Sequence, residues 1–370
     1  MVVSAMGNTT DRLVRLAQDV CHTPPKRELD MLLTTGEQVS IALMAMAIHE
    51  AGHQAISLTG AQVGLVTDSA HTRARIQSIS ADRIRHELDA GRIVIVAGFQ
   101  GIDPTGEITA LGRGASDTTA AALAAVLNAE LCEIYTDVDG IYTADPRLVP
   151  QARKIDQITY DEMLEMASLG AGVMHARAVE FGKKYNVPIH VRSSMTDNQG
   201  TLIVTETQGM ENVVVRGATL RRDLARIVLV NVPNHPGMAA KIFHHIAEHN
   251  VIVDDIIQNV LEGGTRANLG FTVALDGASE AHAVCEKIAE EMGIGGIELD
   301  DQVAKVSIVG IGMRSHTGVA SRTFQALAQA KINIENISTS EIVISVIVRR
   351  DDGEKALRAL HDAFELDKPA

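Results

Sequence analysis

The sequence predicts an α/β domain with a mostly parallel sheet sandwiched by helices, followed by two ferredoxin-like modules of βαββαβ order. Residues 1–207 alternate short apolar runs with helical stretches, an order typical of parallel sheets with crossover helices. This alternation ends at residues 206–209, and the chain beyond them contains an internal repeat. The expected domains are therefore residues 1–207, residues 208–300 with a linker, and residues 301–370.

Apolar runs mark the expected strands of the first domain, because strands buried on both faces read as nearly continuous hydrophobic segments. Helices are expected where apolar residues recur at helical spacing. In such sheets ligands bind beyond the carboxyl ends of the strands, so the loops that follow them are candidate sites. The expected strands are 2–3, 55–58, 93–99, 132–136 and 188–191, and the expected helices are 13–20, 36–51 and 118–127.

The repeat in the C-terminal part has a constant offset of 81 residues, as between His235 and His316. Each copy is expected to begin with a strand, a polar loop and a helix, followed by a second strand that ends at Asp254 or Glu335. A hairpin strand and a second helix complete each copy. The expected first strands are 227–232 and 306–311, the hairpin strands 268–275 and 341–348, and the second helices 281–292 and 353–364.

The bulk composition limits the function classes. A formal net charge of −14 argues against a broad nucleic-acid surface, which needs clustered lysines and arginines. The three cysteines are widely spaced and form neither a disulfide framework nor a zinc site. No run of about 18 uninterrupted apolar residues is present, so no membrane span is expected. We expect a cytoplasmic protein.

A glycine-rich loop, residues 109–119, leads directly into an alanine-rich helix. Glycines let the backbone approach a ligand closely, and the helix start offers free N–H groups and a partial positive charge. Arg113 could form a forked pair with a carboxylate or a phosphate. On spacing alone, an equally good reading is that Ser116 or Asp117 merely caps the helix.

An acidic turn, residues 135–147, follows an expected strand and holds three aspartates within nine residues. Such a turn could bind Mg²⁺ or the ribose hydroxyls of a nucleotide, although turns are rich in Asp and Gly for conformational reasons alone.

Glu37 stands at a helix start, where a carboxylate is already stabilised by the helix dipole. Four histidines, His22, His49, His53 and His71, show no shared metal spacing and are expected at the surface.

Together these segments resemble the aspartate kinases of the amino-acid kinase family, and the two repeats resemble its ACT modules. The resemblance covers nearly the whole chain. It is carried by the strings at residues 3–7, 33–37, 98–101, 111–117, 135–142, 145–147 and 337–342.

The resemblance implies that the γ-phosphoryl group of ATP, with Mg²⁺, is transferred to the side-chain carboxylate of L-aspartate. The product, 4-phospho-L-aspartate, opens the route to lysine, threonine and methionine. Glu37 would bind the amino group of aspartate and Arg113 its α-carboxylate. The other implied residues are Thr35 and Ser116 for the substrate, Asp117 with Arg113 for catalysis, and Thr136, Asp137, Tyr142, Asp145 and Arg147 for the nucleotide; no protein metal ligand is implied.

The ACT resemblance implies feedback inhibition by lysine, threonine or both, and a homodimer or larger assembly formed through these modules. Polar loops at helix starts suit the carboxylate of a free amino acid, and both copies keep the glycine of this loop. The implied effector contacts are Asn234, Gly237, Met238, Ala239, Gln258 and Asn259 in the first module and His316, Gly318, Val319, Asn333 and Ile334 in the second.

Two departures from the family pattern stand out. The family's opening Lys-Phe-Gly-Gly-Thr-Ser segment is absent, and Gly172 stands where a lysine is usual. We therefore expect an N-terminally truncated enzyme that lacks its first strand and phosphate loop and is weakly active or inactive as it stands. A non-catalytic, amino-acid-binding regulatory subunit is the alternative, and a kinase for another small acid is a third interpretation.

Overall fold

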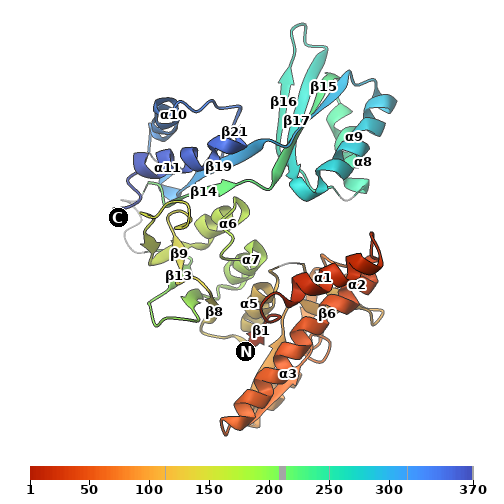
Figure 1. Cartoon of the computed structure of the whole chain (residues 1–370), viewed down its shortest axis with the longest axis vertical. Coiled ribbons are helices and arrows are strands. Elements are labelled where there is room, and N and C mark those ends of the chain that lie inside the picture. The colour runs from red at the N-terminus through yellow and green to blue at the C-terminus, as the bar shows by residue number, and fades with distance from the viewer. Residues whose placement is uncertain (113, 208–213, 250, 315, 369–370) are drawn as a thin grey trace. The chain divides into compact units, whose positions relative to one another are not determined.

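The computed structural model describes residues 1–112, 114–207, 214–249, 251–314 and 316–368. The chain divides into two compact units (Figure 1). The first unit comprises Met1–Ile141, Lys154–Ala167 and Gly172–Gln208, and the second comprises Tyr142–Arg153, Ser168–Ala171 and Gly209–Ala370.

A parallel sheet of order β1-β5-β2 lies at the centre of the first unit. Side chains alternate along β5, so Ile95 packs with Ile41 of helix α3 on one face, while Val96 packs with Leu123 of helix α5 on the other. The sheet is therefore sandwiched by helices, as the sequence predicted. The strands are β1 (Val2–Val3), β2 (Ala55–Leu58) and β5 (Ile93–Ala97), and the helices are α3 (Thr35–Glu50) and α5 (Ser116–Leu127).

A second sheet of the first unit, of order β11-β13-β12-β8, contains two parallel pairs and one antiparallel pair. The expected strands at 132–136 and 188–191 are confirmed as β8 and β12. Its strands are β8 (Cys132–Thr136), β11 (Gln157–Thr159), β12 (Ile189–Ser193) and β13 (Thr201–Val204), and a short pair is formed by β9 (Ile141–Tyr142) and β10 (Lys154–Ile155).

A small sheet of order β4-β3-β6-β7 and several helices have no counterpart among the sequence expectations. Its strands are three or four residues long, too short to show a period. The strands are β3 (Leu65–Thr67), β4 (Ile76–Ile79), β6 (Gln100–Ile102) and β7 (Ile108–Ala110). The remaining helices are α1 (Thr9–Val20), which confirms the expected helix at 13–20, α2 (Lys26–Leu33), α4 (Asp82–Asp89), α6 (Tyr160–Ser168) and α7 (Ala176–Tyr185).

The stretch Lys26–Glu50 is long and apolar enough to cross a membrane by length and composition. Its structure argues for a core element instead. The stretch is divided between α2 and α3 at Thr34. Two carboxylates, Asp30 and Glu37, are buried within it and accept hydrogen bonds from the backbone of other segments. The apolar residues Ile41 and Ala45 pack against the parallel sheet.

The first ferredoxin-like module of the second unit has the predicted βαββαβ order and a sheet of order β16-β17-β15-β18. One expectation is wrong: β16 begins at Asp254 instead of ending there. The apolar pair Val251 and Val253, read as strand residues, packs against the module core ahead of the strand. The elements are β15 (Leu224–Pro233), α8 (Met238–Glu248), β16 (Asp254–Val260), β17 (Arg266–Ala274), α9 (Ala278–Met292) and β18 (Gly296–Asp300).

The second module takes its fourth strand from a place earlier in the chain than expected. Strand β14 pairs antiparallel with β19, giving the order β14-β19-β21-β20. The first module is thus inserted between two strands of the second, and β14 falls outside the expected 301–370 boundary. Likewise, β20 begins at Asn336, whereas a strand ending at Glu335 was expected. The elements are β14 (Gly217–Arg221), β19 (Val303–Val309), α10 (Val319–Gln329), β20 (Asn336–Thr339), β21 (Val343–Arg349) and α11 (Gly353–Ala363).

The segment Tyr142–Arg153 also belongs to the second unit, although the expected boundary placed it in the first domain. Ala144 and Val149 are buried in the core of the second module together with Val306 and Leu360. Apolar burial explains the assignment, because these side chains leave water only against this module.

Candidate functional site

The carboxyl ends of β1 and β5 define the first candidate site. The two strands are parallel with Val3 opposite Ala97, and the N–H of Gly98 donates a hydrogen bond to the carbonyl oxygen of Val3 at 3.0 Å. Both strands end at this edge of the sheet, where the ligands of parallel α/β domains usually bind.

Glu37, in the first turn of α3, is the most informative side chain at this edge. It is 4% exposed. Its Oε1 accepts a hydrogen bond from the N–H of Ala5 at 3.1 Å, directly after β1, whereas its Oε2 has no hydrogen-bond partner among the described residues. Burial raises the pKa of this carboxyl group, and backbone N–H groups oppose the rise. A buried acceptor without a donor is costly, and a ligand ammonium group would satisfy it.

The start of α5 approaches the same edge. A Cβ added to Gly98 would lie 2.6 Å from Oγ of Ser116, so only glycine lets the end of β5 come this close to the helix. The next residue, Phe99, has a φ of 68° and donates its N–H to Oγ1 of Thr119. Glu37 and Ser116 therefore both lie against the ends of β1 and β5. Arg113 lies outside the described residues.

Asp117 is partly buried beside His175. The N–H of His175 lies 3.4 Å from Oδ2 of Asp117, and Oγ1 of Thr118 lies 3.3 Å from Nδ1 of the same imidazole. Burial raises the pKa of Asp117 to about 6, with the His175 N–H opposing. Burial and then the charge of Arg177 lower the pKa of His175. With this raised pKa, the Asp117 carboxyl group changes charge closer to neutral pH than an exposed aspartate does, which makes it a candidate functional group.

The remaining substrate candidate, Thr35, is exposed, and its hydroxyl donates to the carbonyl of Leu32 at 2.7 Å. The hydroxyl thus serves the local helix start. At Gly172, where the family resemblance leads us to expect a lysine, an added Cβ would meet open space. The departure is therefore not forced by packing.

The acidic turn contains the nucleotide candidates of both units. In the first unit, Oγ1 of Thr136 donates to Oδ1 of the exposed Asp137 at 3.1 Å, after β8. In the second unit, Asp145 pairs with Arg147 at 2.8 Å, and this pair lowers the pKa of Asp145. Arg147 remains 87% exposed, and Tyr142 is half-buried. Among the residues that the structure describes, no group of three or more His, Cys, Asp and Glu is arranged to hold a metal ion.

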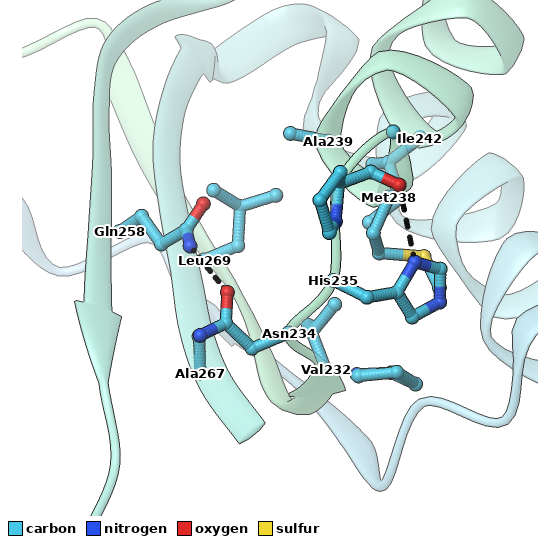
Figure 2. A pocket seen from close by; sticks show the side chains of 12 residues that line it. Val232, Asn234, His235, Met238, Ala239, Ile242, Gln258, Ala267 and Leu269 are labelled. Carbon is cyan, nitrogen blue, oxygen red and sulfur yellow. Dashed lines mark hydrogen bonds between the residues drawn. The ribbon is translucent and has the colours of Figure 1, made fainter. Parts of the chain in front are cut away.

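A hollow of about 430 Å³ lies in the first ferredoxin-like module, between the helix start of α8 and strands β16 and β17 (Figure 2). Nε2 of Gln258 donates to Oδ1 of Asn234 at 3.1 Å across it. Five effector candidates line the hollow: Asn234, Gly237, Met238, Ala239 and Gln258. His235 and Pro236, of the polar loop that the sequence singled out at this helix start, line it as well. Sequence reasoning missed the other lining residues, Val232, Pro233, Ile242, Ala267 and Leu269, because apolar strand and helix positions carry no chemical signal.

Asn259 does not line this hollow. It follows Gln258 in β16, and successive strand side chains point to opposite faces of the sheet. Asn259 instead lines a smaller hollow on the other face, with Asp255 and Glu335.

The effector candidates of the second module serve mainly its own fold. Val319 is buried, and Ile334 packs against the same core. Nδ1 of His316 lies 2.8 Å from the carbonyl oxygen of Gly312, and Asn333 is exposed. The two modules nevertheless share one backbone device. Gly237 and Gly318 have φ values of 90° and 91° at the starts of α8 and α10, a conformation that L side chains rarely adopt.

His71 contradicts its expected surface position. Its Nδ1 lies 2.9 Å from Oδ2 of the fully buried Asp30, and only 19% of the His71 side chain is exposed. The signal that could have found this pair is Asp30 itself, a carboxylate within an apolar helix that needs buried partners.

Comparison with known proteins agrees with this architecture. The chain matches the model of the amino acid kinase family over residues 1–193 and that of the ACT domain over residues 306–364. It is 53% identical to the aspartate kinase of Stutzerimonas stutzeri over 371 aligned residues, covering 100% of this chain and 90% of that protein. It is also 53% identical to the aspartokinase of Pseudomonas aeruginosa, with the same coverage.

Two solved structures of Escherichia coli aspartokinase III, both 28% identical in sequence, resemble this chain. The complex with aspartate and ADP (R-state) gives a TM-score of 0.83 and covers 95% of this chain and 79% of that one. The complex with lysine and aspartate (T-state) gives a TM-score of 0.70 and covers 96% and 79%.

Proposed function

Because the chain belongs to the amino acid kinase family and is an aspartate kinase with ACT domains, we propose that the edge formed by β1, β5, α3 and α5 binds L-aspartate. The buried Oε2 of Glu37 carries this proposal. It is a carboxylate oxygen without a protein donor among the described residues, in a side chain that contacts the backbone just after strand β1. In this proposal the α-amino group of aspartate is its partner. The regulatory-subunit alternative is set aside, since the kinase family match covers the first half of the chain.

The α-carboxylate of aspartate then faces the start of α5, where Ser116 lies and where Arg113 precedes the helix in sequence. A helix start offers N–H donors and a partial positive charge to an anion. Asp117, with its pKa of about 6, is proposed to organise this end of the site through the backbone of His175.

For phosphoryl transfer, an oxygen of the aspartate side-chain carboxylate attacks the γ-phosphorus of ATP. The bond from that phosphorus to the bridging oxygen breaks, and ADP leaves with the electron pair. Such a reaction needs mostly positioning and charge neutralisation. We propose that Thr136 and Asp137, after β8 of the first unit, bind the nucleotide. For Tyr142, Asp145 and Arg147 of the second unit, nucleotide binding stays a prediction of the family resemblance. Mg²⁺ would enter with the ATP phosphates, because it is usually held by one or two carboxylates plus the substrate phosphates.

The hollow in the first ACT module is proposed to bind a free amino acid as feedback effector. A solved relative carries lysine, and the family resemblance offers lysine, threonine or both. None of the twelve residues that line the hollow has a carboxylate, and its polar side chains are Asn234, His235 and Gln258. These groups suit the neutral side-chain hydroxyl of threonine better than the side-chain ammonium group of lysine, which would need a carboxylate partner.

Assembly through the ACT modules is proposed from strand β16, which is the edge strand of its sheet. Its side chains Ile256 and Val260 are 51% and 57% exposed, and the preceding Ile252 is 71% exposed. An exposed edge with apolar side chains is a template for pairing with a second copy. A cytoplasmic location is proposed as well, since ATP and free amino acids are supplied there.

Trapping of aspartyl phosphate tests the function. The protein, with ATP, Mg²⁺ and L-aspartate, should form a hydroxamate when hydroxylamine is added, and formation should need all three. Activity with glutamate or acetylglutamate but none with aspartate would overturn the substrate assignment.

A further inference from the structure

Two loops of the first unit meet beside the proposed aspartate site. One is the turn at residues 68–75, and the other is the glycine-rich loop that leads to α5. The N–H of Ala74 donates to the carbonyl oxygen of Ala110 at 3.0 Å. The carbonyl oxygen of Thr72 lies 3.5 Å from the place that a Cβ of Gly112 would take. The turn therefore packs directly on the backbone that precedes Arg113.

Asp30 of α2 fastens both loops through their N–H groups. Its carboxylate is fully buried and accepts hydrogen bonds from the N–H of Thr72 at 3.0 Å and of Ala110 at 3.0 Å. Nδ1 of His71 provides a third contact at 2.9 Å. Burying a carboxylate costs free energy unless it is fully hydrogen-bonded, so this arrangement needs all these donors in place.

Arg177 of α7 fastens the same two loops through their carbonyl groups. Its Nη1 donates to the carbonyl oxygen of Leu111 at 2.7 Å, and its Nη2 donates to that of Ala74 at 3.1 Å. Burial, followed by the charge of Arg75, lowers the pKa of this half-buried guanidinium. A rigid planar fork holds two acceptors at a fixed spacing, which a flexible lysine does not.

The turn also contains a strained residue. Thr72 has a φ of 70°, in the left-handed region where a β-branched residue is an outlier. Such strain persists only where surrounding contacts overdetermine the backbone, and it gathers at functional sites. Here both carboxylate oxygens of Asp30 lie within hydrogen-bond distance of the Thr72 N–H.

We propose that Asp30 and Arg177 are positioning residues for the aspartate site. Asp30 holds the N–H of Ala110, and Arg177 holds the carbonyl oxygen of Leu111, just before the glycine-rich turn. This inference rests on the proposed function. Neither side chain needs to touch the substrate. Each acts through the loop that connects β7 to α5, and therefore sets the affinity for aspartate without changing the affinity for ATP.

The test compares Arg177→Met with Arg177→Lys and with the control Arg85→Met. Arg85 also donates to a main-chain carbonyl, that of Val126 at 3.1 Å, on a different part of the unit. Arg177→Met should raise the Kd for L-aspartate about 10- to 100-fold, since small displacements of substrate-positioning groups have effects of this size. The Kd for ATP should stay within about twofold, Arg177→Lys should restore part of the affinity, and Arg85→Met should bind aspartate normally.

A purely structural role would lower the melting temperature of Arg177→Met and leave its aspartate affinity unchanged, which would overturn the proposal. Equal loss of aspartate and ATP affinity would overturn it as well. If Arg177→Met does not fold, the aspartate and ATP titrations of Arg177→Lys decide between the same outcomes. Titration of the unsubstituted protein with aspartate tests the proposed function separately. If that protein does not bind aspartate, the function is contradicted, whatever the Arg177 variants do.

Discussion

Oε1 of Glu37 accepts a hydrogen bond from the N–H of Ala5 at 3.1 Å, and this contact joins the start of α3 to the end of β1. It fixes one carboxylate oxygen and leaves the other buried without a partner among the described residues. The unpartnered oxygen destabilises the free protein, and a bound cation would supply its missing partner. This behaviour is expected of a binding residue.

Replacement of Glu37 by Gln should weaken L-aspartate binding about 10- to 100-fold, because a hydrogen bond to a charged group contributes about 1.5–3 kcal/mol. Calorimetric titration measures this, with ATP affinity unchanged. The matched control is Glu28→Gln in α2, where the carboxylate forms an exposed ion pair with Arg27. Aspartate binding by Glu37→Gln at the affinity of the unsubstituted protein would remove Glu37 from the site.

Asp117 makes stability depend on pH with a predictable sign. Its pKa in the folded protein, about 6, lies above the ordinary value of 3.8, so its contribution to stability is greatest at low pH and is lost as pH rises to about 6. Asp117→Asn should therefore stabilise the protein at pH 8 by about 1–3 kcal/mol in unfolding free energy and raise its melting temperature. The substitution should have little effect at pH 4. Thermal unfolding at both pH values measures the difference.

The same substitution should reduce aspartate kinase activity, because the site loses its titrating group. A stabilising effect of Asp117→Asn that is equal at pH 4 and pH 8 would contradict burial as the cause of the shift.

The effector hollow makes a prediction with a control on the same strand. Threonine at 100 times its Kd should stabilise the protein by about 2.7 kcal/mol through linkage. Gln258→Ala should abolish this stabilisation, since Gln258 lines the hollow, whereas Asn259→Ala should keep it, since Asn259 points to the opposite face. Differential scanning fluorimetry with threonine and with lysine measures the effect. No shift of the unsubstituted protein with either amino acid at millimolar concentration would contradict effector binding.

His361 should make the second unit sensitive to acid. It is fully buried in α11, with Nε2 3.1 Å from Oγ1 of Thr143, and burial lowers its pKa. Its contribution to stability is therefore present above pH 6.5 and is lost as pH falls through the lowered value. His361→Gln, which does not titrate, should flatten the decrease in melting temperature below pH 6.5. The control is His249→Gln, at the exposed end of α8, which should leave that decrease unchanged.

The sequence predicted the parallel sheet and the two modules because long apolar strands such as Ile93–Ala97 and a duplicated motif leave strong patterns. It could not place β14 in the sheet of the second module, since pairing between distant segments depends on tertiary packing and not on local period. It could not show that Ala144 and Val149 join that module either, because two apolar residues in a turn do not reveal which core they enter.

Residues of the candidate site could be predicted where their side-chain type signals a function. They could not be predicted where only their position in the folded structure gives them a role. Glu37 and Asp117 stand out as acids at helix starts, but the burial that raises their pKa values cannot be read from the sequence. Their backbone hydrogen-bond partners, Ala5 and His175, lie 32 and 58 residues away. Asp30 and Arg177 carry no motif of their own, and only the loops that they hold reveal them.

A crystal structure with bound L-aspartate is the most direct measurement of the central claim. The α-amino nitrogen of aspartate should lie about 2.8 Å from Oε2 of Glu37, with the α-carboxylate toward the start of α5. Aspartate bound elsewhere, with Oε2 of Glu37 still facing no cation, would contradict the account.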